Sequence, residues 1–192
     1  QELSATCDRI MKDSQGVDVL INCAAVETHG LIDDVPMEAF RLNYEVNFYA
    51  PLYLTKRFLP MMRQKGNAQI VNISSAMGRR SVPGKSAYCI TKFALNALTE
   101  SLRLEVQSKG VHVMMVSPGP IDSNLPKTII RYGGAQFGYE GGLNRKSPAY
   151  VAQKIISGME KKKRVVREWN MTEIFIYLNY LFPRLADYIL SK

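Results

Sequence analysis

The 192-residue sequence predicts a doubly wound α/β fold, in which a parallel sheet lies between two layers of helices. Three nearly continuous apolar runs, at 17–23, 69–75 and 111–117, indicate strands that are buried on both faces. They alternate with longer stretches of helical periodicity. With 46% hydrophobic residues the chain is long enough to bury a sizeable core, so we expect residues 1–192 to form a single domain.

Each element follows from local signals. Pro36 suits the first turn of a helix, and Gly66 and Gly110 suit helix ends. The expected elements, in chain order, are a helix near 1–13, a strand at 17–23, a loop containing His29, helices over 36–65, a strand at 69–75, a long helix over 86–108, a strand at 111–117, an irregular segment at 121–146, a helix near 148–160, a short strand at 164–167 and a helical tail at 168–192.

One Tyr–Lys pair, Tyr88 and Lys92, carries the strongest functional signal. On a helix, residues four apart share a face, so the phenol and the ammonium can point into one cleft. Ser75, thirteen positions before Tyr88, ends a predicted buried strand. Two other pairs have the same spacing but a phenylalanine thirteen positions upstream: Tyr150 with Lys154 and Tyr188 with Lys192.

The chemistry of these groups suits a carbonyl or an alcohol. A nearby cation favours the phenolate, so Lys92 is expected to lower the pKa of Tyr88 and to let the phenol exchange a proton. The Ser75 hydroxyl, at the end of the neighbouring strand, could hydrogen-bond the same substrate oxygen. The pattern therefore indicates interconversion of alcohols and carbonyl compounds.

With these residues in this order, the sequence resembles the short-chain dehydrogenase/reductase family, in its branch with a compact single Rossmann domain. Residues 22–25 read Asn-Cys-Ala-Ala where the family has Asn-Asn-Ala-Gly, and Asn47 lies where the family has a catalytic Asn. Residues 117–123 resemble the Pro-Gly segment that covers the nicotinamide. Cys23 and Ala25 depart from the family, and Cys23 puts the local bracing of the sheet in doubt because a thiol cannot make the hydrogen bonds of an amide.

The resemblance implies a role for each site residue. Tyr88 would be the acid in reduction and the base in oxidation, and Ser75 would polarise the carbonyl. Lys92 would lower the pKa of Tyr88 and bind the nicotinamide ribose, while Asn47 would anchor a water. The implied cofactor is NAD or NADP, no metal is implied, and the implied cofactor contacts are Asn22, Ala24, Tyr88, Lys92, Pro118, Gly119, Ile121 and Ser123.

The family opens with a strand and a Gly-rich turn that cradles the pyrophosphate, and this sequence has no such turn. We therefore expect a partial Rossmann-like domain that lacks the first strands. A truncated, non-catalytic oligomerisation or binding module is the alternative. By resemblance, helices at 44–65 and 86–108 would form a homodimer or homotetramer.

The segment 121–146 corresponds to the family's substrate loop, and its apolar residues favour an apolar ketone or alcohol, with an ordinary surface loop as the alternative. The net charge of +8 does not indicate nucleic-acid binding, because the densest run, 161–164, has four residues and suits a solvated helix end.

The tail contains an apolar run at 174–182 that is too short to span a bilayer. Packing on the protein is the favoured role of this run, and shallow membrane insertion with the basic residues 161–167 on the headgroups is the alternative. Three cysteines without metal spacing indicate reduced thiols, hence a cytoplasmic protein.

Overall fold

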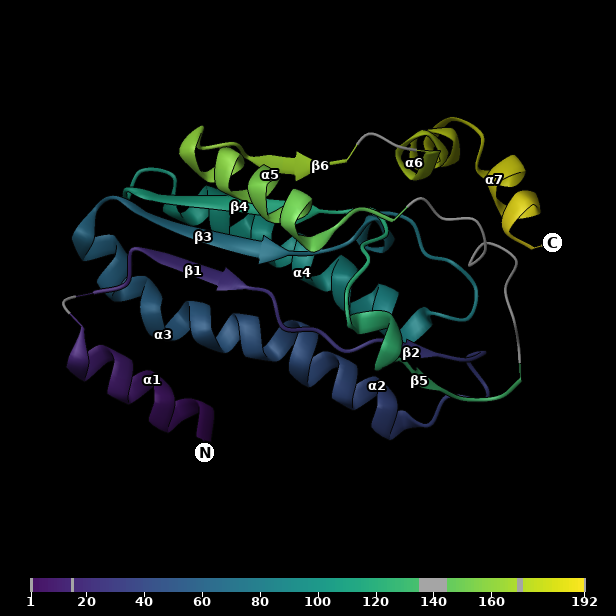
Figure 1. Cartoon of the computed structure of the whole chain (residues 1–192), viewed down its shortest axis with the longest axis horizontal. Helices are drawn as coiled ribbons and strands as arrows, with labels where there is room; N and C mark the ends of the chain where they lie inside the picture. Colours follow the sequence, from purple (N-terminus) through teal and green to yellow (C-terminus); the bar gives the residue numbers. More distant parts are fainter. Residues whose placement is uncertain (1, 15, 135–144, 169–170, 192) are drawn as a thin grey trace.

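The centre of the molecule is a four-stranded parallel sheet (Figure 1). The computed structural model describes residues 2–14, 16–134, 145–168 and 171–191. The sheet has the strand order β1-β3-β4-β6, made of β1 (Val19–Asn22), β3 (Ala68–Ile73), β4 (Val111–Ser117) and β6 (Val165–Arg167). Every neighbouring pair is parallel, which confirms the fold class that the apolar runs predicted.

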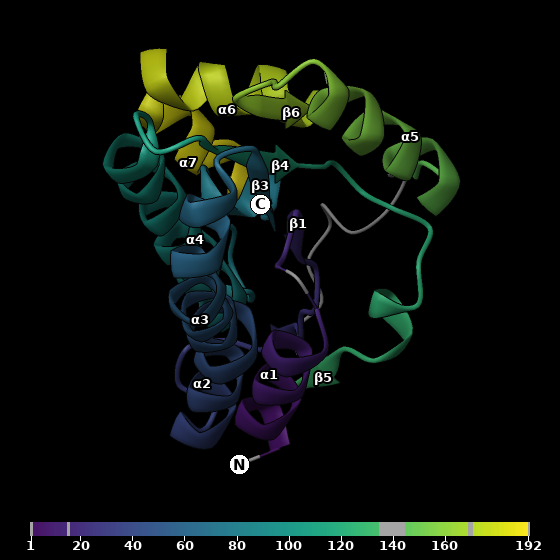
Figure 2. The same cartoon turned by 90° about the vertical axis from the view of Figure 1, so that its left-hand side faces the viewer.

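Helices cover both faces of this sheet. The helices are α1 (Glu2–Asp13), α2 (Met37–Tyr44), α3 (Ala50–Lys65), α4 (Ser86–Val106), α5 (Pro148–Glu160), α6 (Met171–Leu181) and α7 (Pro183–Leu190). In the view of Figure 2, α2, α3 and α4 lie on one side of the sheet and α5 lies on the other. The three-layer arrangement places the carboxyl ends of β1, β3 and β4 at one edge.

The two central strands, β3 and β4, are largely buried because their successive side chains enter two different cores. Ile70 packs with Phe58 and Met62 in the core beneath α3 and α4. Val71, the next residue along β3, packs with Met114 in the core beneath α5. Ile70 and Val71 are both fully buried, which is why this run shows no polar alternation.

Short strands and a 3₁₀ turn occur in two segments that the sequence predicts to be irregular. The predicted loop around His29 contains β2 (Thr28–His29), which pairs in parallel with β5 (Ile130–Arg131). The predicted irregular segment 121–146 contains a 3₁₀ turn, η3 (Leu125–Lys127), as well as β5. Its residues 135–144 lie outside the part of the chain that the structure describes.

The C-terminal helices dock on the segment that follows β3. Arg79 Nη1 donates to both carboxylate oxygens of Glu173 on α6, each at 2.6 Å; Glu173 is buried and Arg79 is largely covered. Arg80 pairs with Asp187 on α7 at 2.5 Å. No helix in the described residues is long and apolar enough to cross a membrane.

Candidate active site

Three predicted site residues meet at the carboxyl edge of the sheet. Ser75 lies two residues after the end of β3, while Tyr88 and Lys92 occupy the first two turns of α4. The Ser75 hydroxyl hydrogen-bonds the Tyr88 phenol. Lys92 Nζ donates to the carbonyl of Ile73 at 2.9 Å and lies 5.5 Å from the centroid of the Tyr88 ring. A buried phenol, a buried ammonium and a half-buried hydroxyl therefore share one site.

Burial controls the protonation of this site. Desolvation raises the pKa of Tyr88 well above its usual value, the charge of Glu27 raises it further, and the hydrogen bond from Ser75 lowers it. Desolvation also lowers the pKa of Lys92 from 10.5 to about 8. The sequence-based prediction of a lowered phenol pKa is therefore wrong for this structure, because desolvation and the charge of Glu27 both raise the pKa of Tyr88.

Asn47 lies in a π-helical turn, η1 (Glu45–Tyr49), between α2 and α3. Its amide clamps the backbone of Val26: Val26 N donates to Asn47 Oδ1, and Asn47 Nδ2 donates to Val26 O, both at 2.9 Å. Asn47 Nδ2 also donates to Thr91 Oγ1 at 3.0 Å, and Thr91 Oγ1 donates to Tyr88 O at 2.7 Å. The turn thus joins Asn47 to the helix that carries Tyr88, as π-turns at functional sites often do.

A chain of amides braces the sheet at the end of β1. Asn22 Nδ2 donates to Asn72 Oδ1 at 2.7 Å, and Asn72 Nδ2 donates to Thr99 Oγ1 at 2.9 Å. Cys23 and Ala24 are exposed. The doubt that Cys23 raised is resolved, because Asn72 on the neighbouring strand supplies the amide.

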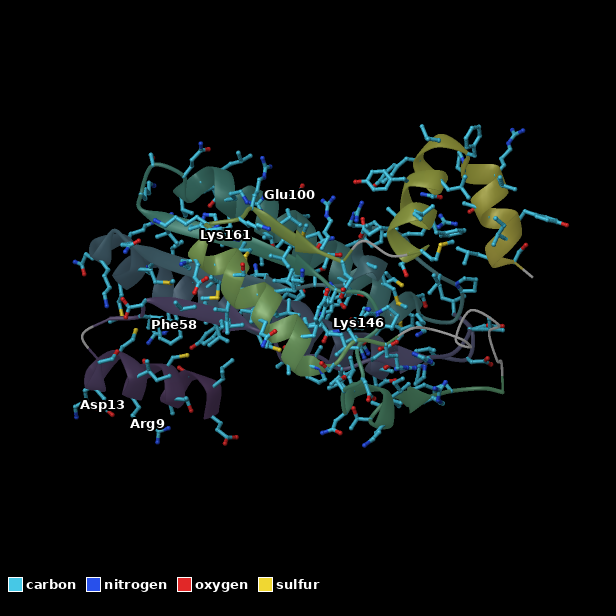
Figure 3. The ribbon with its side chains drawn as sticks, turned by 45° about the horizontal axis from the view of Figure 1, so that its top comes forward. Arg9, Asp13, Phe58, Glu100, Lys146 and Lys161 are labelled. Atoms are coloured by element: carbon cyan, nitrogen blue, oxygen red, sulfur yellow. The ribbon has the colours of Figure 1, made fainter. Side chains whose placement is uncertain are left out.

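The predicted nicotinamide segment follows β4 and is half-buried. Backbone hydrogen bonds fix it: Ala76 N donates to Pro118 O, and Lys146 N donates to Pro120 O at 3.0 Å. Ile121 forms a parallel bridge with Lys146. Figure 3 shows that Lys146 lies near the start of α5, with Lys161 near its other end. Pro118, Gly119, Ile121 and Ser123 therefore lie between the ends of β3 and β4 and the start of α5.

A buried charged cluster beside Tyr88 was not predicted from the sequence. Glu27 Oε1 is 2.6 Å from His29 Nε2 and 3.0 Å from Lys85 Nζ, while Arg131 Nη1 is 3.0 Å from His29 Nδ1. Glu27, His29 and Lys85 are each less than 10% exposed. Three segments far apart in the chain supply the cluster, so no local spacing could have indicated it.

Comparisons with known proteins show the family of this chain. A family model described as short chain dehydrogenase matches residues 1–131. The chain is 34% identical over 186 residues to dehydrogenase/reductase SDR family member 7B of Bos taurus, covering 95% of this chain and 57% of that protein. Its identity to the protein of the same name from Danio rerio is 37%, covering 95% and 60%.

A solved short-chain dehydrogenase from Streptomyces avermitilis is 28% identical, with a TM-score of 0.85, and the match covers 97% of this chain and 74% of that one. The chain thus spans 57–60% of the two vertebrate relatives. The family match to more than half of the chain, together with these relatives, shows that the chain belongs to the short-chain dehydrogenase family.

Proposed function

We propose that the protein is an NAD(P)(H)-dependent oxidoreductase that interconverts a secondary alcohol and a ketone. The observation that carries this proposal is the placement of buried Tyr88 and Lys92 beside half-buried Ser75 at the carboxyl edge of a parallel sheet. Open α/β sheets bind ligands at that edge. Membership of the family supports the same reaction class.

The residues present fit the nicotinamide half of the cofactor. Lys92 is 2% exposed and donates one hydrogen to Ile73 O, and its ammonium has two more that can reach a ribose hydroxyl. The half-buried segment with Pro118, Gly119, Ile121 and Ser123 would lie over the nicotinamide, and the exposed Ala24 lets the backbone after β1 approach the cofactor. The bound dinucleotide supplies or accepts the hydride.

In this mechanism the chain's own residues handle the proton. The Tyr88 phenol gives a proton to the carbonyl oxygen in reduction and takes it back in oxidation, while the Ser75 hydroxyl donates a hydrogen bond to the same oxygen. The positive charge of Lys92 stabilises the phenolate that reduction leaves behind. Asn47 holds Thr91 and Val26, and thereby fixes the helix beneath Tyr88; we propose that it also anchors a water linking Lys92 to solvent.

The substrate proposed here has apolar bulk, since Ile129, Ile130 and Tyr132 in the segment after β4 are half-buried. The proposed protein forms a homo-oligomer in the cytoplasm and does not bind nucleic acid. Membrane association is not favoured, because the basic run near Lys161 and the C-terminal helices lie toward opposite ends of the molecule (Figures 1 and 3).

The proposal is tested by Tyr88→Phe in the protein at its full natural length. Removing the phenol hydroxyl should lower kcat at least about 100-fold while NAD(P)H binding, followed by nicotinamide fluorescence, is retained. Tyr150→Phe is the matched control, because Tyr150 also lies four residues before a lysine but is 37% exposed on α5. Equal losses in the two variants, or full activity in Tyr88→Phe, would contradict the proposal.

A further inference from the structure

The cluster of Glu27, His29, Lys85 and Arg131 joins three parts of the candidate site. Glu27 and His29 belong to the segment around β2, Arg131 ends β5, and Lys85 immediately precedes α4. The backbone reinforces this junction, because Gly30 N donates to Gly84 O at 2.9 Å and Tyr132 N donates to His29 O at 2.9 Å. The cluster therefore fixes the start of the helix that carries Tyr88.

The contacts of His29 indicate which ring nitrogen donates and which accepts. A guanidinium can only donate, so the 3.0 Å contact with Arg131 Nη1 makes His29 Nδ1 an acceptor. The proton then lies on Nε2, which donates to Glu27 Oε1 at 2.6 Å. Lys85 supplies a positive charge bonded directly to the Glu27 carboxylate, at 3.0 Å.

The charge of Glu27 also acts on the candidate catalytic residues Tyr88 and Lys92. Its negative charge raises the pKa of Tyr88 and acts in the same direction on Lys92. From the end of β3, Ser75 acts on Tyr88 in the opposite sense. The Val26 clamp by Asn47 holds the backbone immediately before Glu27, so the position of the carboxylate relative to Tyr88 is fixed.

The other titratable groups near Tyr88 are thiols on either side. Cys89, the next residue on α4, would raise the pKa of Tyr88 if its thiol were ionised, and the charge of Lys85 acts on Cys89. The charge of Cys23, beyond β1, acts on Lys92. Burial raises the pKa of Cys89, so this thiol stays neutral at physiological pH, and Glu27 with Lys85 is the charged pair at this side of the site.

We propose that Glu27 and Lys85 form a charge-balanced positioning pair for Tyr88: Lys85 neutralises the Glu27 carboxylate, and their ion pair anchors the start of α4 to β2. This inference rests on the proposed function. It assigns opposite electrostatic effects to two residues that do not themselves touch the reacting atoms. Loss of the carboxylate favours the phenolate, whereas loss of the ammonium disfavours it.

The test compares pH profiles of kcat/KM for alcohol oxidation in the full-length protein. Glu27→Gln keeps hydrogen-bonding groups but removes the negative charge, so the acid limb of the profile should move to lower pH by about 0.5 to 1 unit. Lys85→Met should move it to higher pH by a similar amount. The double variant should return close to the wild-type profile.

The control is Glu100→Gln, which removes an exposed carboxylate from the same helix (Figure 3) and should leave the profile unchanged. Shifts in the same direction for Glu27→Gln and Lys85→Met, or unshifted profiles in both, would overturn the inference. That result is distinguishable from failure of the proposed function, in which Tyr88→Phe would retain activity.

Discussion

Lys92 shows how the candidate site is built at a cost to stability. The side chain is 2% exposed, and desolvation lowers the pKa of its ammonium from 10.5 to about 8. Between these two values the unfolded chain binds more protons than the folded one, so stability rises with pH in this window. At neutral pH the folded protein holds a buried charge that it would lose in more alkaline solution.

We therefore predict that the difference in unfolding free energy between wild type and Lys92→Met depends on pH in the cofactor-free chain. From about pH 7 to about pH 10 the unfolding free energy of wild type should rise by about 2 to 3 kcal/mol relative to that of Lys92→Met. Urea unfolding of the two proteins in parallel measures this difference. Lys154→Met, at an exposed position on α5, should give a nearly constant difference. A constant difference for Lys92→Met as well would show that its pKa is not lowered.

Sequence spacing predicted that Tyr88, Lys92 and Ser75 lie close together, because residues four apart on a helix and the end of a strand are local features, and the structure brings the three together. Their catalytic roles stay a prediction. The spacing did not give the direction of the Tyr88 pKa shift, which depends on how much water the fold removes. Glu27 and Lys85 had no local signal. Their contact joins residues 58 positions apart and exists only after β2 reaches the start of α4.

At the scale of elements, the Arg79–Glu173 pair connects α6 to the turn that follows Ser75. The side chains of the pair are 10% and 3% exposed, and breaking a buried ion pair leaves the remaining charge without compensation. The contact also lies four residues from Ser75, so α6 supports the wall of the candidate site.

Glu173→Gln should therefore destabilise the protein by about 3 kcal/mol, measured by chemical unfolding. Asp187→Asn is the matched control: it breaks the pair with Arg80, but Asp187 is 65% exposed and should cost at most about 1 kcal/mol. Equal costs in the two variants would mean that the Arg79–Glu173 contact does not anchor α6.

The elements were predictable where the periodicity is long and regular. The helix predicted near 148–160 and the strand predicted at 111–117 have the same bounds in the structure. The π-turn around Asn47, within the predicted helical segment 36–65, could not be predicted, because one extra residue in a helical turn does not change the amino-acid composition. The split of the tail at Pro183 follows from proline at the first position of α7.

At the scale of the whole molecule, an uncovered apolar stripe runs along α4. Ile90 and Phe93 are each 41% exposed and Leu104 is 70% exposed, and their spacing places them on one helix face together with Ala97. Family resemblance predicts that this helix forms subunit contacts. The exposed face is the part of the structure that such a contact would cover.

Phe93→Glu should accordingly weaken self-association of the full-length protein at least about 100-fold, measured by sedimentation equilibrium. Tyr180→Glu alters a tyrosine on α6 that is 63% exposed and should leave assembly unchanged. The reverse outcome would assign the interface to the C-terminal helices.

The exposure of β1, at the edge of the sheet, differs from what its apolar sequence predicts. The run at 17–23 was predicted to be covered on both faces, yet Val19 and Ile21 on β1 are 39% and 48% exposed. Leu20 and Asn22, on the opposite face, are buried under the helices. The side chains on both faces of β1 are thus apolar enough to be buried, but the described residues cover only one of these faces.

The π-turn has a consequence for which changes in length the protein can accept. The π-turn holds one residue more than an α-helical turn, so removing one residue from Glu45–Tyr49 would convert the segment to regular α-helix and leave α3 packed in the core. Asn47 would then no longer be displaced toward Val26 and Thr91, and its hydrogen bonds to both would be lost. A deletion in this short segment would therefore disrupt the candidate site while sparing the hydrophobic core.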